Sequence, residues 1–152
     1  RFVFVGEGGE KKRLISRAAE MGLNNCEFLD SMPKTELAYF LAKCDAAIMC
    51  LENISIFHEG SSPNKFFDYI AAGLPVLNNY PGWLARLIKD YDCGIVVRPG
   101  DDEGFADAVQ YLCAQKDRAA QLGRNARKLA KQFERVKLAD QFSIALEECC
   151  AS

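Results

Sequence analysis

The chain has 152 residues, of which 26% are charged, and this length suits one compact α/β domain. Its formal net charge of −2 excludes the basic excess that would hold nucleic acid or an acidic membrane by charge alone. No apolar run approaches the roughly 20 residues that a membrane-spanning helix needs. Arg1 leads directly into a strand-like run with no targeting leader before it, so we expect a piece of a longer protein.

The seven cysteines are odd in number, and none is spaced as Cys-x-x-Cys. Most of them stand inside apolar runs, where a thiol behaves as a small hydrophobic side chain. We therefore expect reduced, structural cysteines and a cytoplasmic location. Because the chain has a single histidine, His58, and no paired cysteine ligands, we expect no metal site and no cofactor.

Strand-like and helix-like segments alternate along most of the chain. Short apolar runs predict about five strands, at 2–5, 26–29, 46–51, 75–77 and 94–97. Apolar residues at helical spacing predict helices between them, at about 10–21, from 33 onward, at 63–72 and at 83–91. Beyond residue 100 the pattern is purely helical. The alternation predicts a Rossmann-like, doubly wound parallel sheet with helices on both faces and a helical tail.

Ligands of such sheets bind beyond the carboxyl ends of the strands. The loops Gly6–Gly9, Asp30–Pro33 and Glu52–Ser62 each follow a predicted strand, so we expect a ligand at these loops. The glycines of the first loop lack the third glycine of a dinucleotide fingerprint. That loop therefore does not indicate NAD binding.

The helix predicted at 63–72 has well-marked ends. Ser62 suits the N-cap, Pro63 suits the first helical position, and Gly73 suits the left-handed residue after the helix. At about 100° per residue, one side of this helix is apolar and the other is polar. The side expected to face the core carries Phe66, Phe67, Ile70 and Ala71; the side expected to face a ligand or solvent carries Asn64, Lys65, Asp68 and Tyr69.

Lys65 is an unusual residue for the first turn of a helix, where the dipole disfavours a cation. A bound anion would remove that penalty, and the free N–H groups at a helix start already attract anions. The small residues before the helix let the backbone approach a diphosphate, and Asp68 could accept hydrogen bonds from ribose hydroxyls. A solvated Lys65–Asp68 pair explains the same residues equally well.

The run Asp68-Tyr-Ile-Ala-Ala-Gly-Leu-Pro-Val-Leu77 resembles the large family 4 of retaining glycosyltransferases. The donor domain of that family carries a Glu-x7-Glu motif, and Asp68 stands where its second glutamate binds the donor ribose. The first glutamate falls on Gly60, with Glu59 one residue away. Ser62-Pro63-Asn64-Lys65 resembles a subgroup that works on bacterial surface polysaccharides.

The resemblance extends over nearly the whole chain. Phe4–Gly9 is similar to the family's glycine turn, and Phe28–Leu37 to the segment whose backbone contacts the nucleobase. The resemblance implies half of a GT-B fold, with Glu59 and Lys65 as candidate catalytic residues. It implies nucleotide-sugar contacts from Gly6, Glu7, Gly8, Ser31, Met32, Gly60, Ser61, Ser62, Asn64, Lys65 and Asp68.

Two parts of the family's proteins have no counterpart in the chain: the N-terminal acceptor domain, and the first strand and helix of the donor domain. We therefore expect residues 1–152 to be a single donor-binding domain that is inactive alone and has an exposed strand edge. The resemblance implies retaining transfer from a UDP-sugar to a glycan or lipid-linked acceptor. The alternatives are another GT-B nucleotide-sugar enzyme, such as an epimerase, and a non-catalytic α/β binding module.

Two further features have more than one interpretation. Trp83 shares helical spacing with Leu84, Leu87 and Ile88, which favours helix packing over stacking on a ligand. The helical tail holds a basic stretch, interpreted as a solvated face or as a contact with anionic lipid headgroups at the inner side of the membrane. Its residues are Arg124, Arg127, Lys128, Lys131, Arg135 and Lys137.

Overall fold

The computed structural model describes residues 1–150, apart from the side chains of Ser55 and Phe57. The chain divides into two compact units, Arg1–Phe40 and Leu41–Ser152, and each unit is described by itself. No helix among the described residues is both long enough and apolar enough to cross a membrane.

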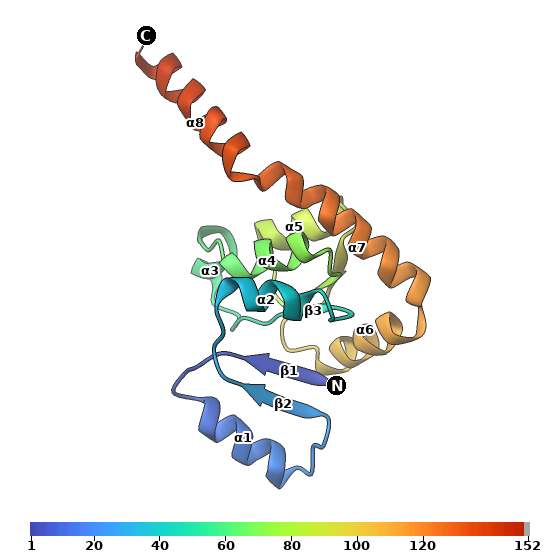
Figure 1. The fold of residues 1–152 in the computed structure, drawn as a ribbon. Coiled ribbons are helices and arrows are strands. Elements are labelled where there is room, and N and C mark those ends of the chain that lie inside the picture. Colours follow the sequence, from blue (N-terminus) through green and yellow to red (C-terminus); the bar gives the residue numbers. More distant parts are fainter. Residues whose placement is uncertain (151–152) are drawn as a thin grey trace. The chain divides into compact units, whose positions relative to one another are not determined.

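The first unit is a β-α-β arrangement (Figure 1). Strands β1 (Phe2–Val5) and β2 (Cys26–Leu29) pair in parallel, with helix α1 (Lys11–Glu20) between them in sequence. Helix α2 (Lys34–Leu41) follows, and the boundary between the units falls at its last residue. The register places Phe4 opposite Phe28, and their rings stack with centroids 4.9 Å apart. This aromatic pair stabilises the two-stranded sheet beyond its backbone hydrogen bonds.

The second unit contains a parallel three-stranded sheet in the order β3-β4-β5, formed by Ala47–Met49, Val76–Asn78 and Gly94–Val96. Two helices lie between β3 and β4 in sequence, α3 (Ser55–Gly60) and α4 (Asn64–Ala72), and α5 (Trp83–Asp90) connects β4 to β5. The helical tail is α6 (Asp102–Ala114), α7 (Lys116–Ala130), the short 3-10 helix η1 (Lys131–Phe133) and α8 (Arg135–Cys150).

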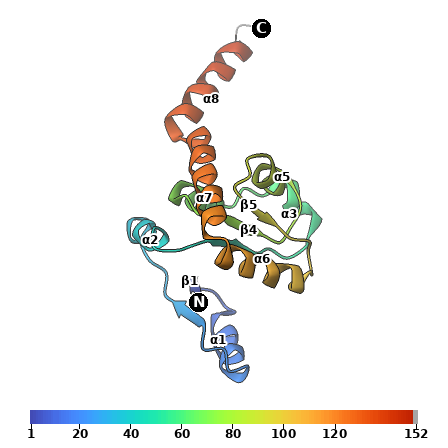
Figure 2. The same cartoon turned by 90° about the vertical axis from the view of Figure 1, so that its right-hand side faces the viewer.

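Helices cover both faces of the three-stranded sheet (Figure 2). On one face, α4, α5 and α7 enclose the main core, in which Phe66, Val76, Ile88 and Leu129 are completely buried. On the other face, Leu77 of β4 packs against Ala108 of α6. Val76 and Leu77 point to opposite faces because side chains alternate along a strand. The predicted parallel α/β fold with helices on both faces is therefore confirmed.

The five strands lie in two sheets, and within residues 1–150 no strand joins them. β1 pairs with β2 on one side only, and β3 pairs with β4 on one side only. Each therefore has a free edge of backbone N–H and C=O groups, a state that proteins usually cover. The exposed strand edge expected from the missing first strand stays a prediction.

Several local predictions for residues 52–72 were wrong. The predicted loop Glu52–Ser62 contains helix α3. Helix α4 begins at Asn64, because Pro63 has an extended backbone with ψ of 123°, and no side chain caps its start. Ser62 is therefore not the N-cap. Ala71 is exposed, because the helix turns it away from the core that receives Phe66 and Ile70.

The last helix carries apolar residues that no part of the described chain covers. Its apolar stripe comprises Leu138, Phe142, Ala145 and Cys149. None of the described residues of α8 is buried, and Phe142 is 66% exposed. Figure 1 and Figure 2 show α8 extending beyond the α/β core of the second unit. Helical spacing predicted the helix correctly, but it could not predict whether anything covers the stripe.

The cysteines are less buried than their apolar surroundings indicated. Cys93 is fully buried, and burial raises the pKa of its thiol to about 11. Cys50, Cys113, Cys149 and Cys150 are exposed, and all seven cysteines are free thiols. The interpretation as a small core side chain therefore holds for Cys93 and is wrong for these four, because neighbours in sequence do not decide which face a side chain occupies.

Candidate functional site

The N-terminus of helix α4 lies in the turn that follows β3 and α3. The chain enters it through Ser61 and Pro63, both in extended conformations. The N–H of Phe66 donates to the carbonyl oxygen of Pro63 at 3.0 Å. The earlier N–H groups, those of Asn64 and Lys65, have no carbonyl one turn back, as at any helix start. They point outward with the positive end of the helix dipole, which favours an anion.

The body of α4 is held firmly. Phe66 and Ile70 are completely buried in the main core. Gly73 closes the helix with φ of 76°, and the N–H of Leu74 donates to the carbonyl oxygen of Tyr69 at 3.1 Å, which is the Schellman arrangement. The predicted C-terminal end is therefore confirmed. A rigid helix body keeps the outward N–H groups at its start in one place.

Lys65 and Asp68 lie one turn apart on α4, and both are half-buried. Partial desolvation raises the pKa of the Cys50 thiol, whereas the Lys65 ammonium acts on it in the opposite direction. Helix α4 contacts β3, and Cys50 follows directly after the carboxyl end of that strand. This is the edge of a parallel sheet at which ligands bind.

Glu59 stands on α3 and is engaged by α5. Its carboxylate accepts two hydrogen bonds from the Arg86 guanidinium, Nη1 to Oε1 and Nη2 to Oε2, each 2.7 Å long. The guanidinium thereby lowers the pKa of Glu59. Sequence reasoning missed Arg86, since no spacing rule links residues on two different helices. It missed also that the Trp83 Nε1–H donates to the carbonyl oxygen of Ser61 at 2.8 Å.

Trp83 serves helix packing, as its spacing indicated. Its ring packs against the main core, and it lies 6.5 Å from the ring of Phe67. Phe67 in turn contacts Phe133 edge-on at 5.0 Å. The packing interpretation of Trp83 is confirmed, and its indole N–H reaches the loop before α4 in addition.

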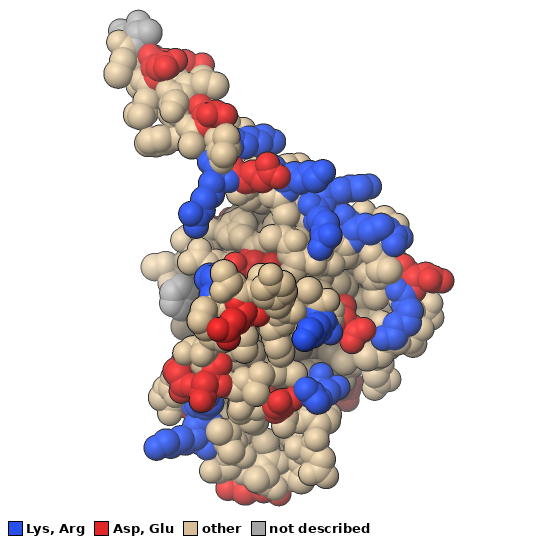
Figure 3. Space-filling view, in the orientation of Figure 1, with Lys and Arg blue, Asp and Glu red and all other residues tan. Residues whose placement is uncertain are grey.

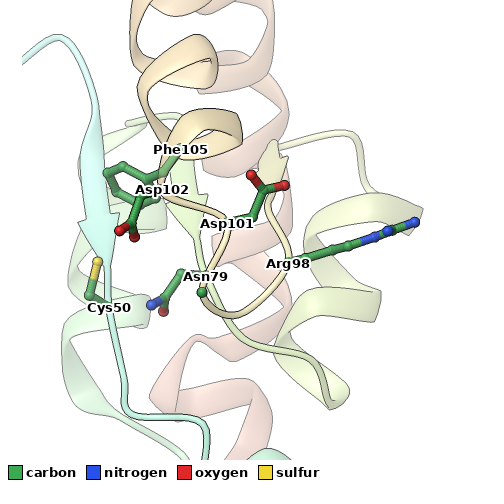
Figure 4. A pocket seen from close by; sticks show the side chains of 7 residues that line it. Cys50, Asn79, Arg98, Asp101, Asp102 and Phe105 are labelled. Carbon is green, nitrogen blue, oxygen red and sulfur yellow. The ribbon is translucent and has the colours of Figure 1, made fainter.

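A cavity of about 220 Å³ opens beyond the carboxyl ends of β3, β4 and β5. Figure 4 shows Asp102 and Phe105 on the side of Cys50 and Asn79, while the Arg98 side chain points away from them. The Asn79 side-chain oxygen accepts the N–H of Leu51 at 3.0 Å. Sequence reasoning missed this cavity, although the rule for parallel sheets also covers the loops after β4 and β5.

The first unit has its own cavity, of about 550 Å³, at the carboxyl ends of β1 and β2. Glu7, Gly8 and Asp30 line it, so the two predicted loops of this unit share one sheet edge. Lys11 binds them together: its Nζ donates to Asp30 at 2.6 Å and to Glu7 at 3.0 Å, and these carboxylates raise its pKa. The backbone of Gly6 has a φ of 142°, a conformation that residues with a side chain rarely adopt.

Ser31 and Met32 follow Asp30 in the same unit, and Met32 is half-buried whereas Ser31 is exposed. Gly60, Ser61, Ser62, Asn64, Lys65 and Asp68 belong to the second unit. Of the predicted site residues, Glu7 and Gly8 line the cavity of the first unit, whereas none of them lines the cavity beyond β3, β4 and β5. Among the residues that the structure describes, no three His, Cys, Asp or Glu side chains gather in a way that could hold a metal ion.

The model of one protein family, described as "Glycosyl transferases group 1", matches residues 1–129. The chain belongs to this family.

Individual relatives agree with the group 1 assignment. The chain is 29% identical over 143 residues to the lipopolysaccharide core biosynthesis glycosyltransferase LpsE of Rhizobium meliloti (strain 1021), covering 91% of the chain and 39% of that protein. Among solved structures, Anabaena Alr3699/HepE in complex with UDP-glucose matches with a TM-score of 0.78 and 21% identity, over 96% of the chain and 40% of HepE.

A second solved structure extends the likeness. Sucrose-phosphate synthase (tll1590) from Thermosynechococcus elongatus matches with a TM-score of 0.83 and 20% identity, over 98% of the chain and 38% of the synthase. At such identities the structures show the fold, and they confirm that the chain has the fold of half a GT-B protein. The group 1 chain spans about two-fifths of the length of these relatives.

Proposed function

We propose that the chain is the donor-binding half of a retaining glycosyltransferase whose donor is a UDP-sugar. The observation that carries the proposal is the start of α4: outward N–H groups, small residues before them and the half-buried Lys65 in its first turn, in a chain of the group 1 family. UDP and UDP-glucose are bound in the solved structures of HepE, which supports a uridine nucleotide.

The chemical work of this half is to stabilise the departing nucleotide. As the bond between sugar and diphosphate breaks, negative charge grows on the leaving diphosphate oxygen. The N–H groups of Asn64 and Lys65 and the Lys65 ammonium provide fixed positive charge for it, with no reorganisation at the moment of reaction. Their rigid attachment through Phe66 and Ile70 keeps that charge in position.

Contacts to the rest of the nucleotide come from Asp68 and from the first unit. Asp68, one turn along α4, accepts hydrogen bonds from the two ribose hydroxyls, as the resemblance to the Glu-x7-Glu motif implies. Gly6, Glu7, Gly8, Ser31 and Met32 of the first unit supply contacts to the nucleotide-sugar. The run Ser62-Pro63-Asn64-Lys65 supports an enzyme of bacterial surface-polysaccharide synthesis, with a glycan or lipid-linked acceptor.

We propose also that a further part of the protein completes the donor domain. The free edges of β1 and β3, together with the two-fifths of the relatives' length that the chain spans, support this. The acceptor domain then lies outside these residues, and residues 1–152 alone bind donor without transferring the sugar.

The experiment is a donor assay on the full-length protein. Titration with UDP and with GDP is expected to give tighter binding of UDP, and transfer from an α-linked UDP-sugar is expected to give an α-linked product by NMR. Conversion of the donor to its epimer without acceptor would indicate the epimerase alternative. No binding of either nucleotide would indicate a binding module that is not a transferase.

The basic face of α7 supports one further partner, an anionic membrane surface. Ala119, Leu122, Ala126 and Leu129 of α7 are buried, so its opposite side faces solvent. That basic face comprises Arg124, Arg127 and Lys128, continued by Lys131 in η1 and by Arg135 and Lys137 in α8, and Figure 3 shows it as a band of blue. Near anionic lipid each such cation contributes about 1 kcal/mol of binding.

We therefore expect the full-length protein to sediment with vesicles that contain phosphatidylglycerol, and less with pure phosphatidylcholine. Reversing Arg124, Lys128 and Lys131 to Glu is expected to release it, because these cations face the bilayer. Reversing Lys12, Arg13 and Arg17, exposed on α1, is the matched control. Equal release by both triple variants would contradict a specific role for the basic face of α7.

A further inference from the structure

The loop that precedes α4 is attached to α5 by side-chain contacts that no motif predicts. Ser61–Pro63 is the whole connection between α3 and α4, and both Ser61 and Pro63 are extended. Such a connection has no internal helix hydrogen bonds. Its conformation therefore depends on what it contacts outside itself.

Trp83 fixes the start of this connection. Its Nε1–H donates to the carbonyl oxygen of Ser61 at 2.8 Å, and its ring packs against the main core. Leu84, Ala85 and Ile88 of the same helix are buried, so α5 is a rigid support. A hydrogen bond from a packed indole holds the Ser61 carbonyl at one distance from the core.

Arg86 fixes the end of α3, one turn further along α5. Its guanidinium makes the two-pronged contact with Glu59, the geometry that an Arg–carboxylate pair uses for orientation. Both side chains remain largely exposed, at 61% for Arg86 and 62% for Glu59. An exposed ion pair adds little to the free energy of unfolding. The main effect of the Arg86–Glu59 pair is therefore to orient the end of α3.

The backbones of α3 and of the residue before α5 are also in close contact. A Cβ atom at Gly82 would lie 1.9 Å from the carbonyl oxygen of His58, and the φ of Gly82 is 112°. The backbone of α3 therefore rests directly on the residue before α5. The close approach, the indole hydrogen bond and the guanidinium fork all join the same two segments.

From these contacts we infer that Trp83 and Arg86 are positioning residues of the donor site, acting through Ser61 and Glu59 on the N–H groups at the start of α4. The inference rests on the proposed function. It assigns to Glu59 a contact with Arg86 rather than with the sugar. The α5 helix thus sets how well the start of α4 is preorganised for a diphosphate.

The test compares Arg86→Gln with Arg118→Gln in the full-length protein. Arg118 makes a similar fork with Asp92 and is 40% exposed, but that pair joins α7 to the turn before β5. Arg86→Gln is expected to speed amide exchange in residues 60–66 and to weaken UDP binding about three- to fivefold, with a thermal midpoint near that of wild type. Arg118→Gln should change neither.

Two further variants sharpen the result. Trp83→Phe keeps the ring and removes the N–H, and it should likewise weaken UDP binding. The exchanged pair Glu59→Arg with Arg86→Glu should restore much of the affinity lost in Arg86→Gln, because the fork is rebuilt in reverse. Unchanged exchange in residues 60–66, or faster exchange with unchanged UDP affinity in Arg86→Gln, would overturn the inference while leaving the donor site intact. If wild type binds no UDP, both the proposed function and the inference fail.

Discussion

Lys65→Ala is expected to weaken UDP binding by the full-length protein by about 10- to 100-fold, the range for losing a hydrogen bond to a charged group. Lys65 is half-buried in the first turn of α4, so water replaces its ammonium poorly. Isothermal titration with UDP measures the change. Because the effect is electrostatic, the loss should shrink as salt is raised.

The control for this result is Lys89→Ala, which removes an exposed lysine from α5. It should leave UDP affinity within twofold of wild type. Lys89→Ala changes the net charge by the same amount as Lys65→Ala, but it does so away from the start of α4. Equal affinities for wild type and Lys65→Ala would support the alternative in which Lys65 and Asp68 form a solvated pair.

Phe66→Ala is expected to lower the free energy of unfolding by about 3–5 kcal/mol, because it leaves a cavity in a fully packed core. Phe66 is 0% exposed and contacts Phe67 edge-on with ring centroids 5.4 Å apart. Urea unfolding followed by circular dichroism measures the change. The variant removes no polar group from the start of α4, so the folded fraction should still bind UDP, but more weakly because Phe66 helps to hold that start in position.

Phe142→Ala is the matched control, since Phe142 is 66% exposed on α8. Its cost should stay within about 0.5 kcal/mol, as for other surface substitutions. A cost as large as that of Phe66→Ala would contradict the exposed position of the α8 stripe.

Much of the fold followed from the sequence because each local signal agreed with the tertiary structure. The strands at 2–5 and 26–29 match β1 and β2, and Gly73 closes α4 in the left-handed conformation. Periodicity did not predict burial correctly where burial depends on residues that are distant in sequence. The stripe on α8 has helical spacing but no covering element in residues 1–150, and Ala71 lies on the outer side of its helix.

The candidate site was predictable only in part. Lys65 in a first helical turn indicated an anion site at the start of α4. Such a prediction is possible from sequence because helix-end rules depend on neighbouring residues. The contacts of Arg86 with Glu59 and of Lys11 with Asp30 join residues 27 and 19 positions apart. No local pattern encodes contacts of that kind, so they needed the structure.

The central claim is that the start of α4 holds the diphosphate of a nucleotide-sugar. Hydrogen–deuterium exchange of the full-length protein with and without UDP tests it directly, because a bound diphosphate engages the N–H groups there. We expect slower exchange at Asn64, Lys65 and Phe66 when UDP is present. Bound UDP that leaves the exchange of these amides unchanged, while protecting others, would contradict it.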